Sequence, residues 1–275
     1  MEYRIPMSAY LTQRKIITDT GLAISPLGLG TVKLGRNKGV KYPDAFNIPD
    51  DKQALNLFTQ AWELGINLID TAPAYGNSEQ RLGELLPKLN KDWIIATKVG
   101  ETFDTDSGES HYNFTAEFIT QSIQQSLKNL RCDVLDIVLI HSDGNDQHII
   151  QHEGALEVLN DLKQQGLIRA TGMSTKTVEG GFLTLQQSDI AMVMHNLDHQ
   201  DEQAVLDQAA ADNKAIFIKK ALGSGHLIRD NSELDPIQAN FDTIYQNPAV
   251  ASIIVGTITP NHLIDNVNKA IRALS

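Results

Sequence analysis

Four side chains that can exchange protons stand at or just after the ends of three apolar runs. The run Leu68-Ile-Asp70 ends in a carboxylate, and Tyr75 follows five residues later. Lys98 ends the next such run along the chain, and His141 ends the one after it. The carboxyl ends of parallel strands share one rim, so we expect these four side chains to meet there.

Together, these residue types predict a proton donor for a carbonyl oxygen. Each alone has a structural explanation: a helix cap, a solvated strand end, a rim histidine or a packing ring. A lysine that leaves an apolar strand needs a carboxylate partner, and Asp70 is the natural one for Lys98. A phenol has an ordinary pKa of about 10. A nearby ammonium or a hydrogen bond from histidine lowers that pKa. We therefore predict that Lys98 lowers the pKa of Tyr75, which acts as a general acid.

Strand-like runs alternate with helical runs along most of the chain. The expected strands are residues 25–31, 66–70, 93–98, 134–140, 168–173, 190–195, 215–220 and 251–256. The expected helices are residues 51–64, 78–88, 115–130, 152–166, 177–187, 201–213, 231–246 and 260–274. This alternation predicts an α/β fold, a (β/α)8 TIM barrel in a single domain. Residues 25–275 would form the barrel, and residues 1–24 an N-terminal β-hairpin or lid that turns at Asp19 to Gly21.

A doubly wound open sheet is the main alternative fold. Its glycine-rich fingerprint is missing, because Lys33 stands where the third glycine after Gly28 and Gly30 should be. No acidic residue closes the next strand in the place that this fingerprint requires. The barrel is therefore favoured.

Composition limits the class of partner. The formal charge of -11 and the pI of about 5.1 make nucleic acids and anionic membranes poor partners. The lone Cys132 has no disulfide partner within the chain, which fits a reducing compartment. No apolar run approaches the roughly 18 residues of a membrane span. We expect a cytoplasmic protein without a metal site, either a monomer or a small homo-oligomer.

At these positions the sequence resembles the aldo-keto reductase superfamily. Asp70-Thr-Ala-Pro-Ala-Tyr75-Gly76, Ala96-Thr-Lys98 and Leu139-Ile-His141 match its catalytic tetrad in order and spacing. The resemblance implies that Tyr75 donates the proton, that Lys98 and Asp70 tune it, and that His141 orients the carbonyl. It further implies that a nicotinamide cofactor exchanges a hydride with a small carbonyl or alcohol substrate.

The loops after the seventh and eighth expected strands offer a phosphate site. Gly223 and Gly225 allow backbone N–H groups to form an anion-binding nest, and Pro260 suits the first turn of the last helix. One of the adjacent Lys219 and Lys220 must point into the barrel or its rim. With the contacts that the resemblance implies, the expected cofactor residues are Thr31, Asp70, Ser174, Lys219, Lys220, Ala221, Leu222, Gly223, Gly225, Gly256, Thr257, His262, Asp265 and Asn266.

Several positions depart from the family pattern where the cofactor is expected. Thr175 replaces an asparagine, Met192 replaces a glutamine, and Lys219 stands where an aromatic ring commonly stacks on the nicotinamide. Gly256 and His262 occupy the positions of a basic pair that grips a 2′-phosphate. NADP(H) remains the favoured cofactor because it is usual for the family, with NAD(H) as the alternative.

Two long rim loops are expected to line the substrate pocket. The loop after the third expected strand carries Phe103, His111 and Tyr112, and the loop after the fourth carries His148.

Two other functions remain open from sequence. The first is a Schiff-base aldolase with Lys98 or Lys220 as the nucleophile. The second is a cofactor-binding regulatory or scaffold barrel with little turnover.

Overall fold

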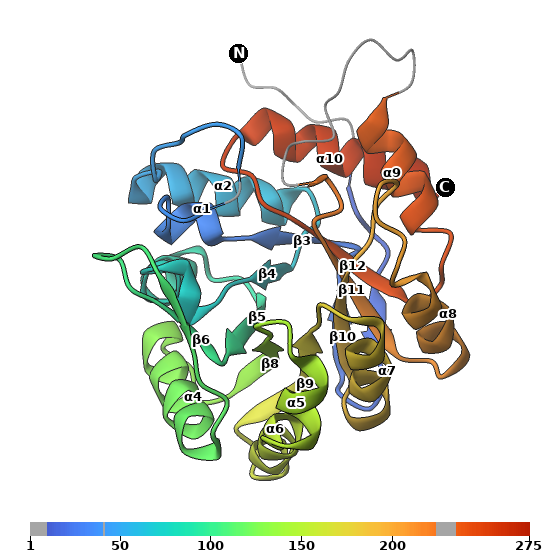
Figure 1. Ribbon diagram of the computed structural model, residues 1–275. Coiled ribbons are helices and arrows are strands. Elements are labelled where there is room, and N and C mark those ends of the chain that lie inside the picture. Colours follow the sequence, from blue (N-terminus) through green and yellow to red (C-terminus); the bar gives the residue numbers. More distant parts are fainter. Residues whose placement is uncertain (1–9, 41, 224–234) are drawn as a thin grey trace.

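Eight parallel strands close into a barrel in the computed structural model, which describes residues 10–40, 42–223 and 235–275. The barrel strands are β3 (Leu27–Gly30), β4 (Leu68–Asp70), β5 (Ile94–Val99), β8 (Leu135–His141), β9 (Ile168–Ser174), β10 (Ile190–Met194), β11 (Ala215–Lys219) and β12 (Val250–Val255). Neighbours pair in the order β10-β11-β12-β3-β4-β5-β8-β9. The first barrel strand, β3, lies beside the last, β12, and so closes the ring (Figure 1). The predicted (β/α)8 fold is confirmed.

Helices surround this ring of strands (Figure 1). They are α1 (Val32–Gly35), α2 (Asp51–Glu63), α3 (Ser78–Leu85), α4 (Ala116–Leu130), α5 (Asp146–Gln151), α6 (Ala155–Gln164), α7 (Val178–Gln187), α8 (Gln203–Ala211), α9 (Pro236–Ile244) and α10 (Pro260–Ala273), with 3-10 turns η1 (Pro73–Tyr75) and η2 (Leu86–Leu89). Their starts follow local rules. Asp50 and Gln53 form a capping box at α2, Thr115 caps α4, and Asp235 caps α9 in front of a proline.

The structure corrects three expected elements. The helix expected at residues 152–166 is α6, which begins only at Ala155 because Gly154 adopts a left-handed φ of +65°, and a further helix, α5, lies in the loop expected before it. The helix expected at residues 78–88 ends at Leu85, after which Pro87 lies in the first turn of η2. The loop expected after the third strand instead forms an antiparallel hairpin of β6 (Glu101–Phe103) and β7 (Ser110–Tyr112).

Alternation along each strand separates two cores. On β8, Val138 and Ile140 pack outward against the helices, whereas Ile137 and Leu139 pack inside the barrel. Successive strand side chains point to opposite faces, so the next inward position is His141. The same alternation decides which groups reach the mouth of the barrel from the other strands.

The predicted N-terminal hairpin forms from β1 (Lys15–Ile17) and β2 (Leu22–Ile24). Its apolar residues Ile17, Leu22 and Ile24 belong to the interior cluster of the barrel. The hairpin bonds to residues just before β4 and β12: Asn67 donates to the Ala23 carbonyl, and Lys15 donates to that of Pro248. The hairpin therefore closes the amino end of the barrel, opposite the rim where the strands end, and it is no lid over that rim. Within the described residues, no helix is long and apolar enough to cross a membrane.

Candidate active site

Five barrel strands end in inward polar side chains. Asp70 ends β4, His141 ends β8, Ser174 ends β9 and Lys219 ends β11, while Lys98 lies one residue before the end of β5. In each strand the residue two positions earlier faces the barrel interior, so these side chains face the mouth. The structure thus brings together at one rim the Asp, Lys and His that the sequence analysis selected.

Asp70 and Lys98 form a buried ion pair at the centre of this rim. Lys98 Nζ lies 2.6 Å from Asp70 Oδ1, and their side chains are 2% and 5% exposed. Lys98 Nζ also donates to the carbonyl of Thr71 at 2.8 Å. A pair this deeply buried is costly to break, because removing one charge leaves the other buried without a partner.

Tyr75 lies above this pair on a short turn. It ends η1, and Gly76 follows with φ +63°, where a side chain would collide with the Gly35 carbonyl at 2.1 Å. Lys98 Nζ lies 4.7 Å from the centroid of the Tyr75 ring. The rings of Tyr75 and His141 meet edge to face, with centroids 6.2 Å apart.

The pKa of Tyr75 moves in the direction opposite to the sequence prediction. Burial raises the pKa of Tyr75 well above its usual value, and the nearby carboxylates of Asp70 and Glu101 raise it further. Arg36 opposes them without reversing the shift. The expected lowering by Lys98 was wrong, because Lys98 contacts Asp70, and that same carboxylate raises the pKa of the phenol. Tyr75 is held as a neutral phenol.

His141 has a carboxylate partner that the sequence analysis missed. Its Nδ1 lies 2.7 Å from Oε2 of Glu101, which is the first residue of β6. Burial lowers the pKa of His141, and this effect outweighs the opposite effect of Glu101. Burial raises the pKa of Glu101, but His141, Ser110 and Arg36 together hold it down to about 2. The sequence signal that could have pointed to this partner was an acidic residue three positions after Lys98.

Lys219 is the inward member of the two adjacent lysines. Its Nζ donates to Ser174 Oγ at 2.8 Å and to the Thr175 carbonyl at 2.6 Å. Burial lowers its pKa to about 7, despite the opposing negative charge of Glu202. Lys220 is exposed and has a left-handed φ of +54°.

The expected cofactor residues fall into two groups. Thr31 is fully buried, and its hydroxyl donates to the carbonyl of Asp70 at 2.9 Å, so it positions that strand end. Gly30 ends β3 and Gly256 follows the neighbouring strand β12, and a side chain on Gly30 would lie 3.2 Å from the Ile254 side chain and 3.6 Å from the Gly256 Cα. The absence of a side chain at Gly30 therefore lets these strands pack closely at this point of the barrel.

The remaining cofactor positions lie on the last two loops. Ala221 is buried, Leu222 is half-buried, and Gly223 has φ +54°, whereas Gly225 lies outside the described residues. Thr257 and Asn266 are buried, and His262 is exposed. Asp265 contacts Lys269, which also lies 3.1 Å from Asp235.

The expected substrate residues divide in the same way. Phe103 is half-buried, with the guanidinium of Arg36 3.5 Å above its ring, and Tyr112 stacks on Phe114. His111 is exposed. His148 is mostly exposed and pairs with Glu153 at 3.4 Å.

Tyr42 is a further aromatic residue at the mouth that the sequence analysis missed. A side chain on Gly256 would lie 3.0 Å from its hydroxyl. Burial raises the pKa of Tyr42 to about 12, with smaller contributions from Tyr75 and Asp70, so its hydroxyl lies near both. Lys33 Nζ lies 3.9 Å from its ring centroid.

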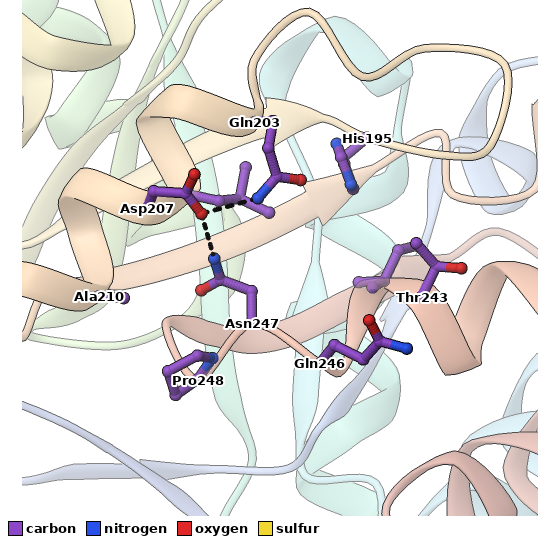
Figure 2. A pocket seen from close by; sticks show the side chains of 10 residues that line it. His195, Gln203, Asp207, Ala210, Thr243, Gln246, Asn247 and Pro248 are labelled. Carbon is purple, nitrogen blue, oxygen red and sulfur yellow. Dashed lines mark hydrogen bonds between the residues drawn. The ribbon is translucent and has the colours of Figure 1, made fainter.

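A separate cavity of about 410 Å³ lies between α8 and the turn that precedes β12 (Figure 2). Asp207 accepts hydrogen bonds there from Gln203 and Asn247. His195 lines it, 2% exposed, and its Nδ1 has no hydrogen-bond partner in the described part of the chain. None of the four expected catalytic residues lines this cavity. No cluster of three His, Cys, Asp or Glu among the described residues could hold a metal ion.

A barrel rim that combines a buried Asp–Lys pair with tyrosine and histidine defines a class of oxidoreductase barrels, and comparison with known proteins agrees. The model of the aldo/keto reductase family matches residues 26–243. The crystal structure of a putative aldo-keto reductase from Pseudomonas aeruginosa is 47% identical, with a TM-score of 0.88 and 100% of both chains covered.

Two curated relatives extend this comparison. The chain is 27% identical to the NADH-specific methylglyoxal reductase of Escherichia coli (strain K12), covering 89% of this chain and 69% of that protein. An uncharacterized oxidoreductase of Bacillus subtilis (strain 168) is 31% identical, and the match spans 60% of this chain and 49% of that relative. The chain belongs to the aldo/keto reductase family, whose members are oxidoreductases that use nicotinamide cofactors.

Proposed function

We propose that this protein interconverts a small aldehyde or ketone with its alcohol, using a nicotinamide dinucleotide. The observation that carries the proposal is the Asp70–Lys98 ion pair beneath Tyr75, with His141 beside it at the same rim. This arrangement places a neutral O–H donor over two cationic or polar groups that can stabilise a developing alkoxide.

Tyr75 suits this chemistry although its pKa is raised. A phenol with a high pKa stays protonated across the neutral pH range, so the proton that it donates is always present. An alkoxide is far more basic than a phenolate, so the proton still moves downhill once the carbonyl has taken the hydride. Lys98 then stabilises the phenolate that is left, because its ammonium lies 4.7 Å from the ring centroid.

The residues present fit a nicotinamide group. When bound, that group supplies or takes up the hydride. Ser174 and Lys219 offer polar contacts to its carboxamide at the mouth. The first turn of α10 offers free N–H groups for a phosphate.

The charges on α10 and at the start of α9 favour NAD(H) over the NADP(H) that family membership alone suggests. Lys269 contacts both Asp265 and Asp235, so in this cluster of described residues two carboxylates and one ammonium leave a net charge of -1 at the expected adenosine end. A 2′-phosphate there would meet repulsion. The relative named as NADH-specific is consistent with this preference.

Three side chains form the wall expected to meet the substrate. Tyr42 and Phe103 supply rings, and Arg36 supplies a guanidinium that lies 4.0 Å from Glu101. This wall suits a small carbonyl compound with one polar end. We place Tyr112 at its outer edge, because 40% of that residue is exposed.

The test replaces the proton donor and measures binding separately. Tyr75→Phe should lower carbonyl reduction by about 10²–10⁴-fold, while NADH and NADPH, titrated in parallel by fluorescence, keep their parental affinities. Tyr10→Phe, a matched change at an exposed tyrosine, should have no effect on either measurement. Reduction by Tyr75→Phe at the parental rate refutes the assignment. Tenfold tighter binding of NADPH than NADH refutes the charge argument alone.

The two other functions fit the structure less well. The carboxylate of Asp70 holds Lys98 as an ammonium, whereas an imine-forming lysine must be neutral. Lys220 is exposed on a loop. The rim keeps all four groups that carbonyl reduction needs, so nothing in it favours a scaffold without turnover.

A further inference from the structure

Glu101 is built into the site as a fixed partner of His141. It is 8% exposed, and its two oxygens have separate partners. Oε2 lies 2.7 Å from His141 Nδ1, and Oε1 accepts from Ser110 Oγ at 2.6 Å across the β6–β7 hairpin. Arg36 Nη1 lies 4.0 Å from Oε1. The hairpin thus holds the carboxylate against one nitrogen of the imidazole.

This contact decides where the proton of a neutral His141 resides. The contact lies off the axis of the ring N–H, so it is a close electrostatic contact rather than a linear hydrogen bond. An unprotonated Nδ1 would still place its lone pair against a carboxylate oxygen at 2.7 Å, which is repulsive. Nδ1 therefore carries the proton, and Nε2 of the neutral ring has a lone pair.

The consequence concerns the substrate oxygen. With Nδ1 held by Glu101, Nε2 is the nitrogen left for the substrate. A lone pair on Nε2 accepts a hydrogen bond from an alcohol O–H, but it cannot donate one to a carbonyl oxygen. Only the imidazolium has N–H on both nitrogens.

We propose that Glu101 is a positioning residue that fixes His141 as its Nδ1–H tautomer and thereby makes its role depend on protonation. As imidazolium, His141 donates from Nε2 to a carbonyl and supports reduction. As neutral imidazole, it accepts at Nε2 from an alcohol and supports oxidation. This inference rests on the proposed carbonyl chemistry, whereas the tautomer itself does not.

Several groups influence the protonation of His141. Those that face His141 are Glu101 from β6, Lys98 from β5, Lys219 from β11 and the Tyr75 ring from η1. Those that face Glu101 are His141, Ser110, Arg36 and Tyr112. Lys98 and Lys219 disfavour the imidazolium, and Glu101 is the group among them that favours it. Removing its charge must therefore lower the pKa of His141.

The experiment compares Glu101→Gln with Glu109→Gln. Glu109 is an exposed carboxylate of the same hairpin, so the control removes one charge without touching His141. Nitrogen-15 NMR of the imidazoles reports tautomer and pKa without any turnover, and a His141→Asn spectrum assigns the signal. Direct observation is needed because Lys219, with a pKa of about 7, loses its proton in the same range.

We expect the Nδ1–H tautomer in the parent and in Glu109→Gln. In Glu101→Gln the His141 midpoint should fall by about 1–3 pH units. The alkaline decline of carbonyl reduction should move down with it, while alcohol oxidation keeps its rate at high pH. Glu101→Asp, which keeps the charge, should restore part of the shift.

Two results overturn the inference: a parental Nε2–H tautomer, or a His141 midpoint unchanged between the parent and Glu101→Gln. A third outcome separates it from the proposed function. If the parent reduces no carbonyl but shows the Nδ1–H tautomer and the midpoint shift, the positioning role of Glu101 stands and the proposed reaction fails.

Discussion

Asp146 should be a costly polar side chain to remove from the rim. It is 1% exposed at the start of α5. Its Oδ2 accepts from the backbone N–H of Lys176 at 2.7 Å, and from both the N–H and the hydroxyl of Thr177 at 2.8 Å. Its Oδ1 accepts from Ser142 Oγ. One carboxylate thus joins the loop after β8 to the loop after β9.

The cost of Asp146→Ala follows from these contacts. The change leaves the part-buried backbone N–H groups of Lys176 and Thr177 without their acceptor, and a group without an acceptor costs about 1–3 kcal/mol where it is shielded from water. We expect a total loss of about 3–5 kcal/mol in the free energy of unfolding. Asp146→Asn keeps an oxygen toward both N–H groups and loses only the charge, so it should cost about 1–2 kcal/mol.

Thermal unfolding would show this difference. At about 2.1 cal/mol/K per residue, a chain of this size has an unfolding entropy near 0.6 kcal/mol/K. The Tm of Asp146→Ala should therefore fall by about 5–9 °C, and that of Asp146→Asn by about 2–3 °C. Asp161→Ala, an exposed change on α6, should move it by less than about 1 °C.

Either of two results would refute this reasoning. One is an Asp146→Ala variant as stable as Asp161→Ala, which would mean that water or loop movement satisfies the freed N–H groups. The other is equal damage from Asn and Ala, which would mean that the charge matters more than the acceptor geometry. A secondary effect is weaker cofactor binding, because the Thr175 carbonyl that holds Lys219 lies next to this loop.

Two further predictions concern Lys219 and the helix pair α3–α4. Because the pKa of Lys219 is about 7, its ammonium loses its proton between about pH 6 and 8. The oxidised cofactor, whose nicotinamide ring is cationic, should then bind several-fold tighter at alkaline pH, whereas the affinity for the reduced cofactor should not change. Lys219→Met should abolish this pH dependence. An affinity of the parent for oxidised cofactor that does not vary with pH would contradict the prediction. Gly83→Ala places a methyl group 2.1 Å from the Asn129 carbonyl, so it should lower the free energy of unfolding, measured in urea, by about 1–3 kcal/mol. The control Gln80→Ala, on the exposed face of the same helix, should lower it by less than about 0.5 kcal/mol.

The barrel and the placement of its polar strand ends were predictable from sequence. Period-two alternation fixes which side chains of a strand face inward, and parallel strands share one rim. Asp70, Lys98 and His141 could therefore be expected to meet before any coordinates were known. The turn at Asp19 to Gly21 was predictable for a local reason, since glycine readily takes the left-handed conformation that the turn needs.

Contacts between loops were not predictable in this way. Glu101 reaches His141 because residues 101–112 fold back as a hairpin, and no short-range sequence pattern predicted that hairpin. Asp146 reaches Lys176 and Thr177 across thirty and thirty-one positions of chain. The direction of the Tyr75 pKa failed for a related reason, because it depends on which neighbour takes up the charge of Lys98.

The two inward lysines of the rim show how partners, rather than residue type, decide the chemistry. Lys98 has a carboxylate at 2.6 Å, so its charge is matched and it serves as a fixed electrostatic support for Tyr75. Lys219 donates to a hydroxyl and a carbonyl, which are both uncharged, and burial therefore lowers its pKa to about 7. Both face His141, so the imidazolium is stable only in so far as Glu101 opposes them. On our inference, Glu101 thus sets the balance between reduction and oxidation at this rim.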